Sequence, residues 1–265
     1  MLIQILTAVA VLGLMGLIFG ALLSVASRFF FVKEDERKDQ IIEALPGANC
    51  GGCGYSGCAA YADAVLAGKA GPNVCPDGGQ TSADAICKIM GLESAPAVRK
   101  YARVRCSGNN EVAVHKYKYE GLDDCVAATR LLDGYMQCRF GCLGFGNCVR
   151  HCPVGAIEIK NGVAVIDKET CVGCSVCVAT CPKQVIEIVP YETKYAVGCS
   201  SHDKGAATRK NCRTGCIGCK LCEKACEFDA IHVTDSLAVI DYDKCTGCGA
   251  CAEKCPSHII FKISD

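Results

Sequence analysis

The sequence predicts an α+β protein built of small cysteine-rich modules behind an apolar N-terminal segment. Three observations lead to this prediction. Residues 2–27 carry no charged side chain, 25 of the 265 residues are cysteine, and one pattern of cysteines occurs twice. Thiols at this density are expected to be disulfides or metal ligands. The 28 basic and 28 acidic residues balance, so the composition gives no support for nucleic-acid binding.

Residues 1–27 form the first predicted domain, a transmembrane helix that anchors the chain. About 20 apolar residues are enough to cross a bilayer, and the uncharged run is longer than that. A cleaved signal peptide is the alternative, but no basic segment precedes the apolar run. Arg28 and Lys33 follow it, which favours a cytoplasmic location for the rest of the chain. A reducing compartment also suits a chain with many free thiols.

Residues 28–100 form the second predicted domain, with one metal site. Its expected ligands are Cys50, Cys53, Cys58 and Cys75. Four thiolates without a histidine fit one [4Fe–4S] cluster, and structural zinc bound by the same cysteines is the alternative. The composition predicts short helices at 59–67 and 83–90, the second with Cys87 as a buried small side chain.

Nine cysteines in the rest of the chain recur 74 residues later, which indicates an internal duplication. The first copy contains Cys125, Cys138, Cys142, Cys148, Cys152, Cys171, Cys174, Cys177 and Cys181. The second contains Cys199, Cys212, Cys216, Cys222, Cys226, Cys245, Cys248, Cys251 and Cys255. We therefore predict two tandem modules, residues 101–190 and 191–265.

Three cysteine runs have the spacing that holds iron–sulfur clusters in bacterial proteins. They are Cys171-x2-Cys174-x2-Cys177-x3-Cys181-Pro182, Cys245-x2-Cys248-x2-Cys251-x3-Cys255-Pro256 and Cys216-x2-Cys219-x2-Cys222-x3-Cys226. The first three cysteines of such a run bind one cluster, and the fourth binds the neighbouring cluster. Zinc sites usually have two CxxC pairs or include histidine, and an odd number of cysteines cannot pair completely as disulfides. The spacing therefore predicts iron–sulfur clusters.

Each module is also expected to contain a β-hairpin between its two cluster loops. Residues 157–159 and 163–166 alternate in polarity around Asn161-Gly162, which is a hairpin signal. Residues 231–233 and 237–240 are the equivalent strands in the second copy. This arrangement is that of a bacterial two-cluster ferredoxin, present twice.

The first module departs from the pattern at Phe145, which occupies the position of Cys219. Its opening run therefore lacks one ligand. Cys138 is the nearest candidate to replace it. Our hypothesis is that Cys138 binds iron, whereas its counterpart Cys212 does not.

With this replacement the sequence predicts five [4Fe–4S] clusters, one of them in the second domain. The first module provides Cys138, Cys142, Cys148 and Cys181 for one cluster and Cys152, Cys171, Cys174 and Cys177 for another. The second module provides Cys216, Cys219, Cys222 and Cys255 for one cluster and Cys226, Cys245, Cys248 and Cys251 for another. The cysteines left without a role are Cys87, Cys106, Cys125, Cys199 and Cys212.

The order of these features resembles the B subunit of the Rnf complexes, which are membrane-bound ferredoxin:NAD⁺ oxidoreductases that couple electron flow to sodium or proton export. The resemblance covers nearly the whole chain. It rests on the apolar anchor, on the motif from Cys50 to Cys58 with Cys75, and on the ferredoxin modules. The segment from Arg139 to Cys148 is similar to that family's variant of the opening run. Two modules are similar to the versions in anaerobic clostridial or acetogenic bacteria.

The resemblance implies an electron-transfer component of an ion-translocating enzyme. Reduced ferredoxin would deliver electrons on the cytoplasmic face of the plasma membrane, and the clusters would pass them to membrane and flavin-bearing partner subunits. The residues themselves contain no acid–base pair, serine nucleophile, phosphate loop or dinucleotide fingerprint. No substrate-transforming site is therefore predicted in this chain.

A basic segment of the second module is the predicted docking surface for ferredoxin. Its basic residues are Lys204, Arg209, Lys210, Arg213, Lys220 and Lys224. Ferredoxins are commonly acidic, and complementary charge speeds encounter. We therefore expect electrons to enter at the C-terminal module and leave from the N-terminal cluster. A solvated charged face without a partner is the alternative.

Two other functions fit the same pattern. A membrane-anchored polyferredoxin of a hydrogenase or formate dehydrogenase complex would share the chemistry and differ in its partners. A redox-regulatory protein that reduces a sensor is the second alternative. Proteins that co-purify from solubilised membranes distinguish these functions, and an anaerobic visible and EPR spectrum distinguishes iron from zinc.

Overall fold

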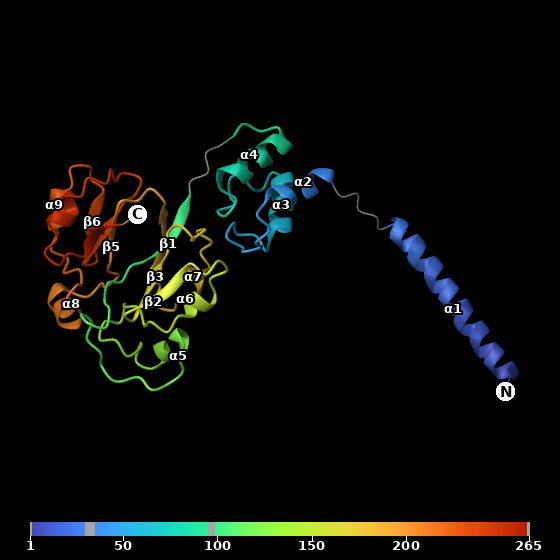
Figure 1. The fold of residues 1–265 in the computed structure, drawn as a ribbon, viewed down its shortest axis with the longest axis horizontal. Coiled ribbons are helices and arrows are strands. Elements are labelled where there is room, and N and C mark those ends of the chain that lie inside the picture. The colour runs from blue at the N-terminus through green and yellow to red at the C-terminus, as the bar shows by residue number, and fades with distance from the viewer. Residues whose placement is uncertain (1, 30–34, 95–98, 264–265) are drawn as a thin grey trace.

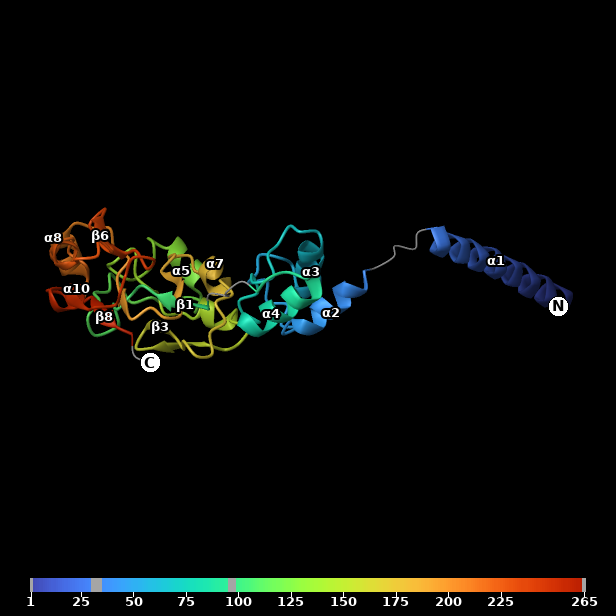
Figure 2. The same cartoon turned by 90° about the horizontal axis from the view of Figure 1, so that it is seen from above.

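The computed structural model describes residues 2–29, 35–94 and 99–263, which form an N-terminal helix and two folded bodies (Figure 1). The smaller body is helical. The larger body contains two modules of short strands and helices. The two bodies lie next to each other in the perpendicular view as well (Figure 2).

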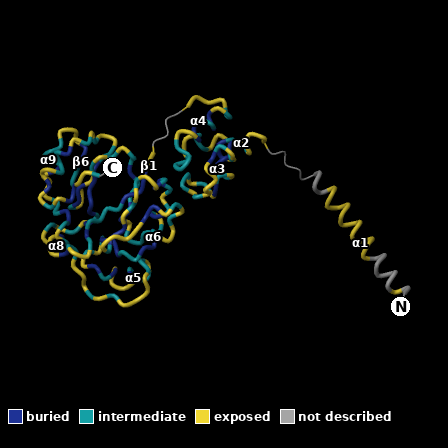
Figure 3. The backbone as a smooth tube through the Cα atoms, in the orientation of Figure 1, coloured by how far each residue is buried: buried dark blue, intermediate teal, exposed yellow. Residues whose placement is uncertain are grey.

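The N-terminal helix α1 spans Leu2–Phe29, 28 residues. Its side chains from Leu12 to Val25 are exposed (Figure 3). Within the described residues, which in α1 include the side chains of Gln4 and of residues 12–25, no helix is long and apolar enough to cross a membrane. The transmembrane anchor therefore stays a prediction.

The smaller body consists of α2 (Glu36–Ala44), α3 (Cys58–Leu66) and α4 (Gly79–Met90). Its core includes Ile41, Tyr61 and Ile86, whose side chains are fully buried. The hydroxyl of Tyr61 donates a hydrogen bond to the carbonyl of Gly71 at 2.7 Å. This bond ties the loop after α3 to the core. The helices predicted at 59–67 and 83–90 are confirmed, and Cys87 is buried as expected.

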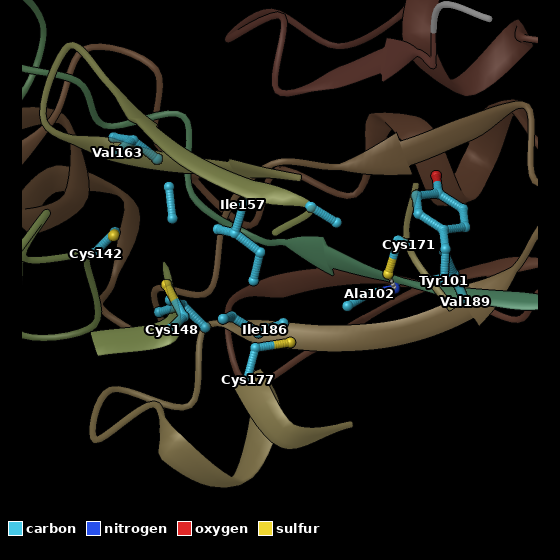
Figure 4. Close-up of a cluster of buried hydrophobic side chains, with 13 residues drawn as sticks. Tyr101, Ala102, Cys142, Cys148, Ile157, Val163, Cys171, Cys177, Ile186 and Val189 are labelled. Atoms are coloured by element: carbon cyan, nitrogen blue, oxygen red, sulfur yellow. Dashed lines mark hydrogen bonds between the residues drawn. The ribbon is translucent and has the colours of Figure 1, made fainter. Parts of the chain in front are cut away.

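The first module joins four strands as two antiparallel pairs. β1 (Lys100–Val104) pairs with β4 (Ile186–Pro190), and β2 (Ile157–Lys160) pairs with β3 (Val163–Ile166). Its helices are α5 (Cys125–Arg130), α6 (Asn147–Arg150) and α7 (Val176–Thr180). Buried cysteines share the core with aliphatic side chains such as Ile157 and Val189 (Figure 4).

The second module repeats this plan. β5 (Tyr195–Val197) pairs with β8 (Ile260–Lys262), and β6 (Ile231–Thr234) pairs with β7 (Leu237–Ile240). Its helices are α8 (Gly205–Asn211), α9 (Leu221–Ala225) and α10 (Ala250–Glu253).

Both predicted hairpins are confirmed, with the same backbone geometry in their turns. Asn161 and Gly162 have φ of 48° and 82°, and Asp235 and Ser236 have φ of 48° and 66°. Two consecutive positive φ angles match the right-handed twist of the flanking strands. Asp235 and Ser236 therefore hold this conformation without a glycine.

Backbone hydrogen bonds join the two modules along the segment that follows β1. The N–H of Ser107 donates to the carbonyl of Gly198 at 2.8 Å, and that of Val114 donates to Asn211 at 2.9 Å. This segment, green in Figure 1, therefore runs beside β5 and α8 of the other module. The buried guanidinium of Arg103 adds a bond to the carbonyl of Val197 at 3.2 Å. The modules thus share a continuous junction.

Candidate metal centres

Four cysteines of the smaller body line one hollow at the N-terminus of α3. They are Cys50, Cys53, Cys58 and Cys75. The Asn49 side-chain oxygen accepts a hydrogen bond from the N–H of Cys58 at 2.8 Å. The N–H of Gly78 points at the sulfur of Cys75 at 3.4 Å. The structure thus brings together the four cysteines that the spacing grouped.

A second group lies beside α7 in the first module. The thiols close enough to affect the charge of Cys177 are those of Cys171, Cys174 and Cys152, which the spacing grouped with it, and that of Cys148. Burial, and after it the neighbouring thiols, raise the pKa of Cys177 to about 12. The sulfur of Cys171 accepts the N–H of Ala102 at 3.3 Å (Figure 4), and that of Cys152 accepts the N–H of Ala156 at 3.3 Å.

In the first module, Cys125 lies with the cysteines of the opening run. One hollow is lined by Cys125, Cys142, Cys148 and Cys181. Burial, and after it the nearby thiols of Cys142, Cys125 and Cys181, raise the pKa of Cys148 to about 12. The grouping of Cys138 with this set therefore differs from the structure, and Cys125 takes its place.

A hydrogen-bond network explains the position of Cys125. Asp124 caps α5 by accepting the N–H of Ala127 at 2.8 Å. The side chain of Asn147 accepts the N–H of Cys125 at 2.8 Å and donates to the Asp124 carboxylate at 2.7 Å. Because Asn147 directly precedes Cys148, the network holds the start of α5 against the cluster loop.

Phe145 has become part of an aromatic cluster. Its ring lies 5.2 Å from that of Tyr119 and 5.5 Å from that of Tyr135, centroid to centroid. The position that carries Cys219 in the other module thus contributes packing here.

The second module holds two groups in the predicted combinations. One hollow is lined by Cys216, Cys219, Cys222 and Cys255. The other is lined by Cys226, Cys245, Cys248 and Cys251. The sulfur of Cys226 accepts the N–H of Ala230 at 3.4 Å, which repeats the contact of Cys152 with Ala156. Cys219 and Cys248 are exposed.

Four further cysteines line a hollow at the junction of the two modules. They are Cys106, Cys138, Cys199 and Cys212. The sequence assigned no role to three of them and placed Cys138 elsewhere. Cys87 is thus the one cysteine of the 25 outside the six groups.

Glycines let the cluster loops approach the neighbouring backbone. Gly144 has φ of 71°, and a Cβ there would lie 2.5 Å from the carbonyl oxygen of Gly162. Gly173 has φ of 67°, and a Cβ there would lie 2.5 Å from the carbonyl oxygen of Lys100. Only glycine fits these positions without a shift of the backbone.

These groups fit iron–sulfur clusters by donor chemistry. Each provides four thiols, and in several groups backbone N–H groups point at sulfur, as expected where amides stabilise thiolate and sulfide. Within the described residues, no set of three or more His, Cys, Asp or Glu is arranged to hold a single metal ion. The fold and the thiol groups define an iron–sulfur protein of the polyferredoxin class.

Comparison with known families agrees with this class. Residues 45–76 match a family described as "Putative Fe-S cluster". Residues 137–185 and 215–259 each match the family of 4Fe-4S dicluster domains. The chain therefore contains [4Fe–4S] modules in the two positions where the 74-residue repeat lies.

Relatives that match nearly the whole of this chain identify its family. The chain is 46% identical over 261 residues to the B subunit of the Na⁺-translocating ferredoxin:NAD⁺ oxidoreductase complex of Acetobacterium woodii, covering 98% of this chain and 78% of that protein. It is 42% identical over 254 residues to the B subunit of the ion-translocating oxidoreductase complex of Methanosarcina acetivorans, covering 96% of each. It is 42% identical over 257 residues to the B subunit of the proton-translocating ferredoxin:NAD⁺ oxidoreductase complex of Clostridium ljungdahlii, covering 96% and 90%. The chain belongs to the family of B subunits of ion-translocating oxidoreductase (Rnf) complexes.

The sequence interpretation did not place Cys125 in the thiol group where the structure has it. A signal for it was present, because Cys125 and Cys199 keep the 74-residue register. The structure gives the two positions different surroundings, since Cys125 lines the opening hollow of its module and Cys199 lines the hollow at the junction.

Proposed function

We propose that this chain is the iron–sulfur relay subunit of a membrane-bound, ion-translocating ferredoxin:NAD⁺ oxidoreductase. The observation that carries the proposal is that the loops of neighbouring thiol groups lie close together. A Cβ on Gly52 of the N-terminal loop would lie 2.7 Å from the Cα of Cys174. The thiols of Cys148 and Cys177, from the two groups of the first module, are close enough to influence each other's charge. Such a series suits transport of single electrons.

Five of the groups are the proposed ligands of [4Fe–4S] clusters. The first module's opening cluster takes Cys125 with Cys142, Cys148 and Cys181, and the other four sets are those that the spacing grouped. When bound, each cluster accepts and releases one electron. The residues of the chain fix the ligands and direct N–H groups at sulfur, which sets the potential of each site. No proton transfer by a side chain is needed for this relay.

Electron entry at the second module is supported by exposure and charge. Cys219 and Cys248 are the exposed members of their groups. Lys220 follows Cys219, and both Lys220 and Lys224 are exposed at α9. Acidic ferredoxin is the proposed donor, because complementary charge favours its encounter with this surface.

The membrane location is proposed for residues 1–27. A helix of 28 residues measures about 42 Å at 1.5 Å per residue, which is enough to span a bilayer. The relatives' names place them in ion-translocating complexes. We therefore assign the iron–sulfur bodies to the cytoplasmic side of the membrane. The proposed partners are the other subunits of the complex. The domain limits proposed are 1–27, 28–100, 101–190 and 191–265.

The test uses the full chain, purified without oxygen from membranes in mild detergent. Reduced ferredoxin should bleach its visible absorption, and membrane and flavin-bearing subunits should accompany it. A version without residues 1–27 should be recovered away from membranes. Reduction by dithionite but not by ferredoxin, at any salt concentration, contradicts the proposed function.

A further inference from the structure

The junction of the two modules contains an unassigned group of four thiols. Cys106 follows β1, Cys138 precedes the first cluster loop, Cys199 follows β5, and Cys212 follows α8. All four line one hollow. Its space is about 420 Å³ including the mouth, against 310–380 Å³ for the hollows of four proposed cluster sites. There is room for a group of the same size.

The sulfurs of this group receive backbone N–H groups, as those of the other groups do. Cys199 accepts from Ser201 and from Cys216, each at 3.4 Å. Cys106 accepts from Cys142 at 3.4 Å. Burial raises the pKa of the Cys106 and Cys199 thiols, whereas these N–H groups act in the opposite direction. A hydrogen bond from an N–H group favours the thiolate, which is the form that binds metal.

Two of the three donors, Cys142 and Cys216, belong to the neighbouring groups. Cys142 lines the opening hollow of the first module, and Cys216, 74 residues later, lines the opening hollow of the second. The junction group is therefore in direct contact with one thiol group of each module. The junction group thus lies between the thiol groups of the first module and those of the second.

The duplication also accounts for the group. Cys138 and Cys212 are equivalent by the 74-residue repeat, and both line the junction hollow. Each module thus contributes the same position to a shared site, and Cys199 and Cys106 complete it. All four are free thiols, so no disulfide competes for them.

We propose that Cys106, Cys138, Cys199 and Cys212 bind a sixth [4Fe–4S] cluster, which connects the two ferredoxin-like modules electronically. The inference rests on the proposed relay function and extends it. Electrons that enter the C-terminal module reach the first module through this site. Each transfer moves one electron from a reduced cluster to an oxidised neighbour, so charge balances without a further reactant.

Iron, zinc and acid-labile sulfide are counted in the full chain purified without oxygen. Six clusters give about 24 irons per chain, and five give about 20. The double variant Cys106→Ala/Cys199→Ala should lose about four irons, as should Cys138→Ala/Cys212→Ala. Cys87→Ala is the control, because Cys87 is buried on α4 outside every group, and it should keep the wild-type count.

About 20 irons in the wild type overturns the proposal even if both double variants fail to fold. The proposal is also overturned if the wild type contains one zinc per chain and the double variants lose this zinc and no iron. Freeze-quenched EPR after mixing with reduced ferredoxin adds a kinetic readout. In a double variant the C-terminal clusters should reduce at the wild-type rate, whereas those of the N-terminal half should reduce at least about tenfold more slowly. If ferredoxin fails to reduce the wild type, the relay function falls while the iron count still decides the sixth site.

Discussion

The side-chain oxygen of Asn147 accepts the backbone N–H of Cys125 at 2.8 Å. These residues are 22 positions apart, and the bond places the first residue of α5 at the hollow of the first module's opening cluster. In the proposed ligand assignment, Cys125 of this distant helix replaces the ligand that is missing at Phe145. The replacement depends on polar contacts that a cysteine motif does not contain.

Cys125→Ala should damage the opening cluster of the first module, because three cysteines remain around it. The expected result is a three-iron EPR signal in the oxidised protein or a loss of about four irons. The measurement is made in the Cys106→Ala/Cys199→Ala background, which removes the junction site. In this background Cys138→Ala is the control and should cost no further iron. If Cys138→Ala and not Cys125→Ala lowers the count, the ligand assignment is reversed.

Asn147→Ala should loosen the same cluster without removing a ligand. It leaves the part-buried N–H of Cys125 without its acceptor, which costs about 1 kcal/mol, while Asp124 keeps its bond to the N–H of Ala127. We expect faster iron loss to a chelator from the first module and an unchanged iron content at the start of the experiment. Asn73→Ala, an exposed position of the N-terminal body, is the control. Equal rates in the two variants would show that the network does not hold Cys125.

Gly144→Ala and Gly155→Ala separate the cost of a positive φ from the cost of a close approach. Their φ angles are 71° and 67°, but a Cβ at Gly155 meets nothing within 4 Å. Gly155→Ala should therefore cost about 1–2 kcal/mol from the left-handed backbone alone. Gly144→Ala adds the clash with the Gly162 carbonyl and should cost about 3 kcal/mol or more. The rate of cluster bleaching in guanidinium compares them, and similar rates would contradict the close packing of loop and hairpin.

Local spacing predicted the sites whose ligands lie within one run. Cys171, Cys174 and Cys177 occupy successive steps of three, so a single loop brings them to one cluster and the spacing suffices. The hairpins were predictable for the same reason, since a two-residue turn and flanking alternation are local signals. The pairing of β1 with β4 joins residues 82 to 90 positions apart, from Val104 opposite Ile186 to Lys100 opposite Pro190. Nothing local in the sequence indicates it.

Sites assembled across the fold could not be predicted in this way. Cys106 and Cys212 line one hollow because backbone hydrogen bonds hold the segment after β1 beside α8. Cys125 reaches its hollow through Asp124 and Asn147. The repeat placed Cys125 and Cys199 at equivalent positions, but the spacing assigned no role to either. In the proposed ligand sets only the first module needs a replacement, since Phe145 occupies the position of Cys219.

Removal of the clusters should unfold the two modules and spare the helical body. Cysteines form part of both module cores, where Cys148 and Cys177 pack with Ile157 and Ile186, and without iron these cores lose their central contacts. The core of α2, α3 and α4 consists mainly of aliphatic and aromatic side chains. A chelator under reducing conditions should therefore abolish hydrogen-exchange protection in β1–β8 and retain protection in α2–α4. Retained protection in the strands would show that the modules do not depend on iron.

Charge reversal at α9 tests the entry surface. Lys220 and Lys224 are one helical turn apart and exposed, and Lys220 lies 3.9 Å from the partly exposed Glu223, a pair that solvent screens. Lys220→Glu/Lys224→Glu should lower the rate of reduction by ferredoxin about tenfold at low salt. The difference should shrink at high salt, because screening weakens long-range attraction. Lys69→Glu/Lys88→Glu changes the net charge equally on the N-terminal body, where both lysines are exposed, and should leave the rate nearly unchanged. If the two double variants slow the reaction alike, net charge and not a local docking surface controls the encounter.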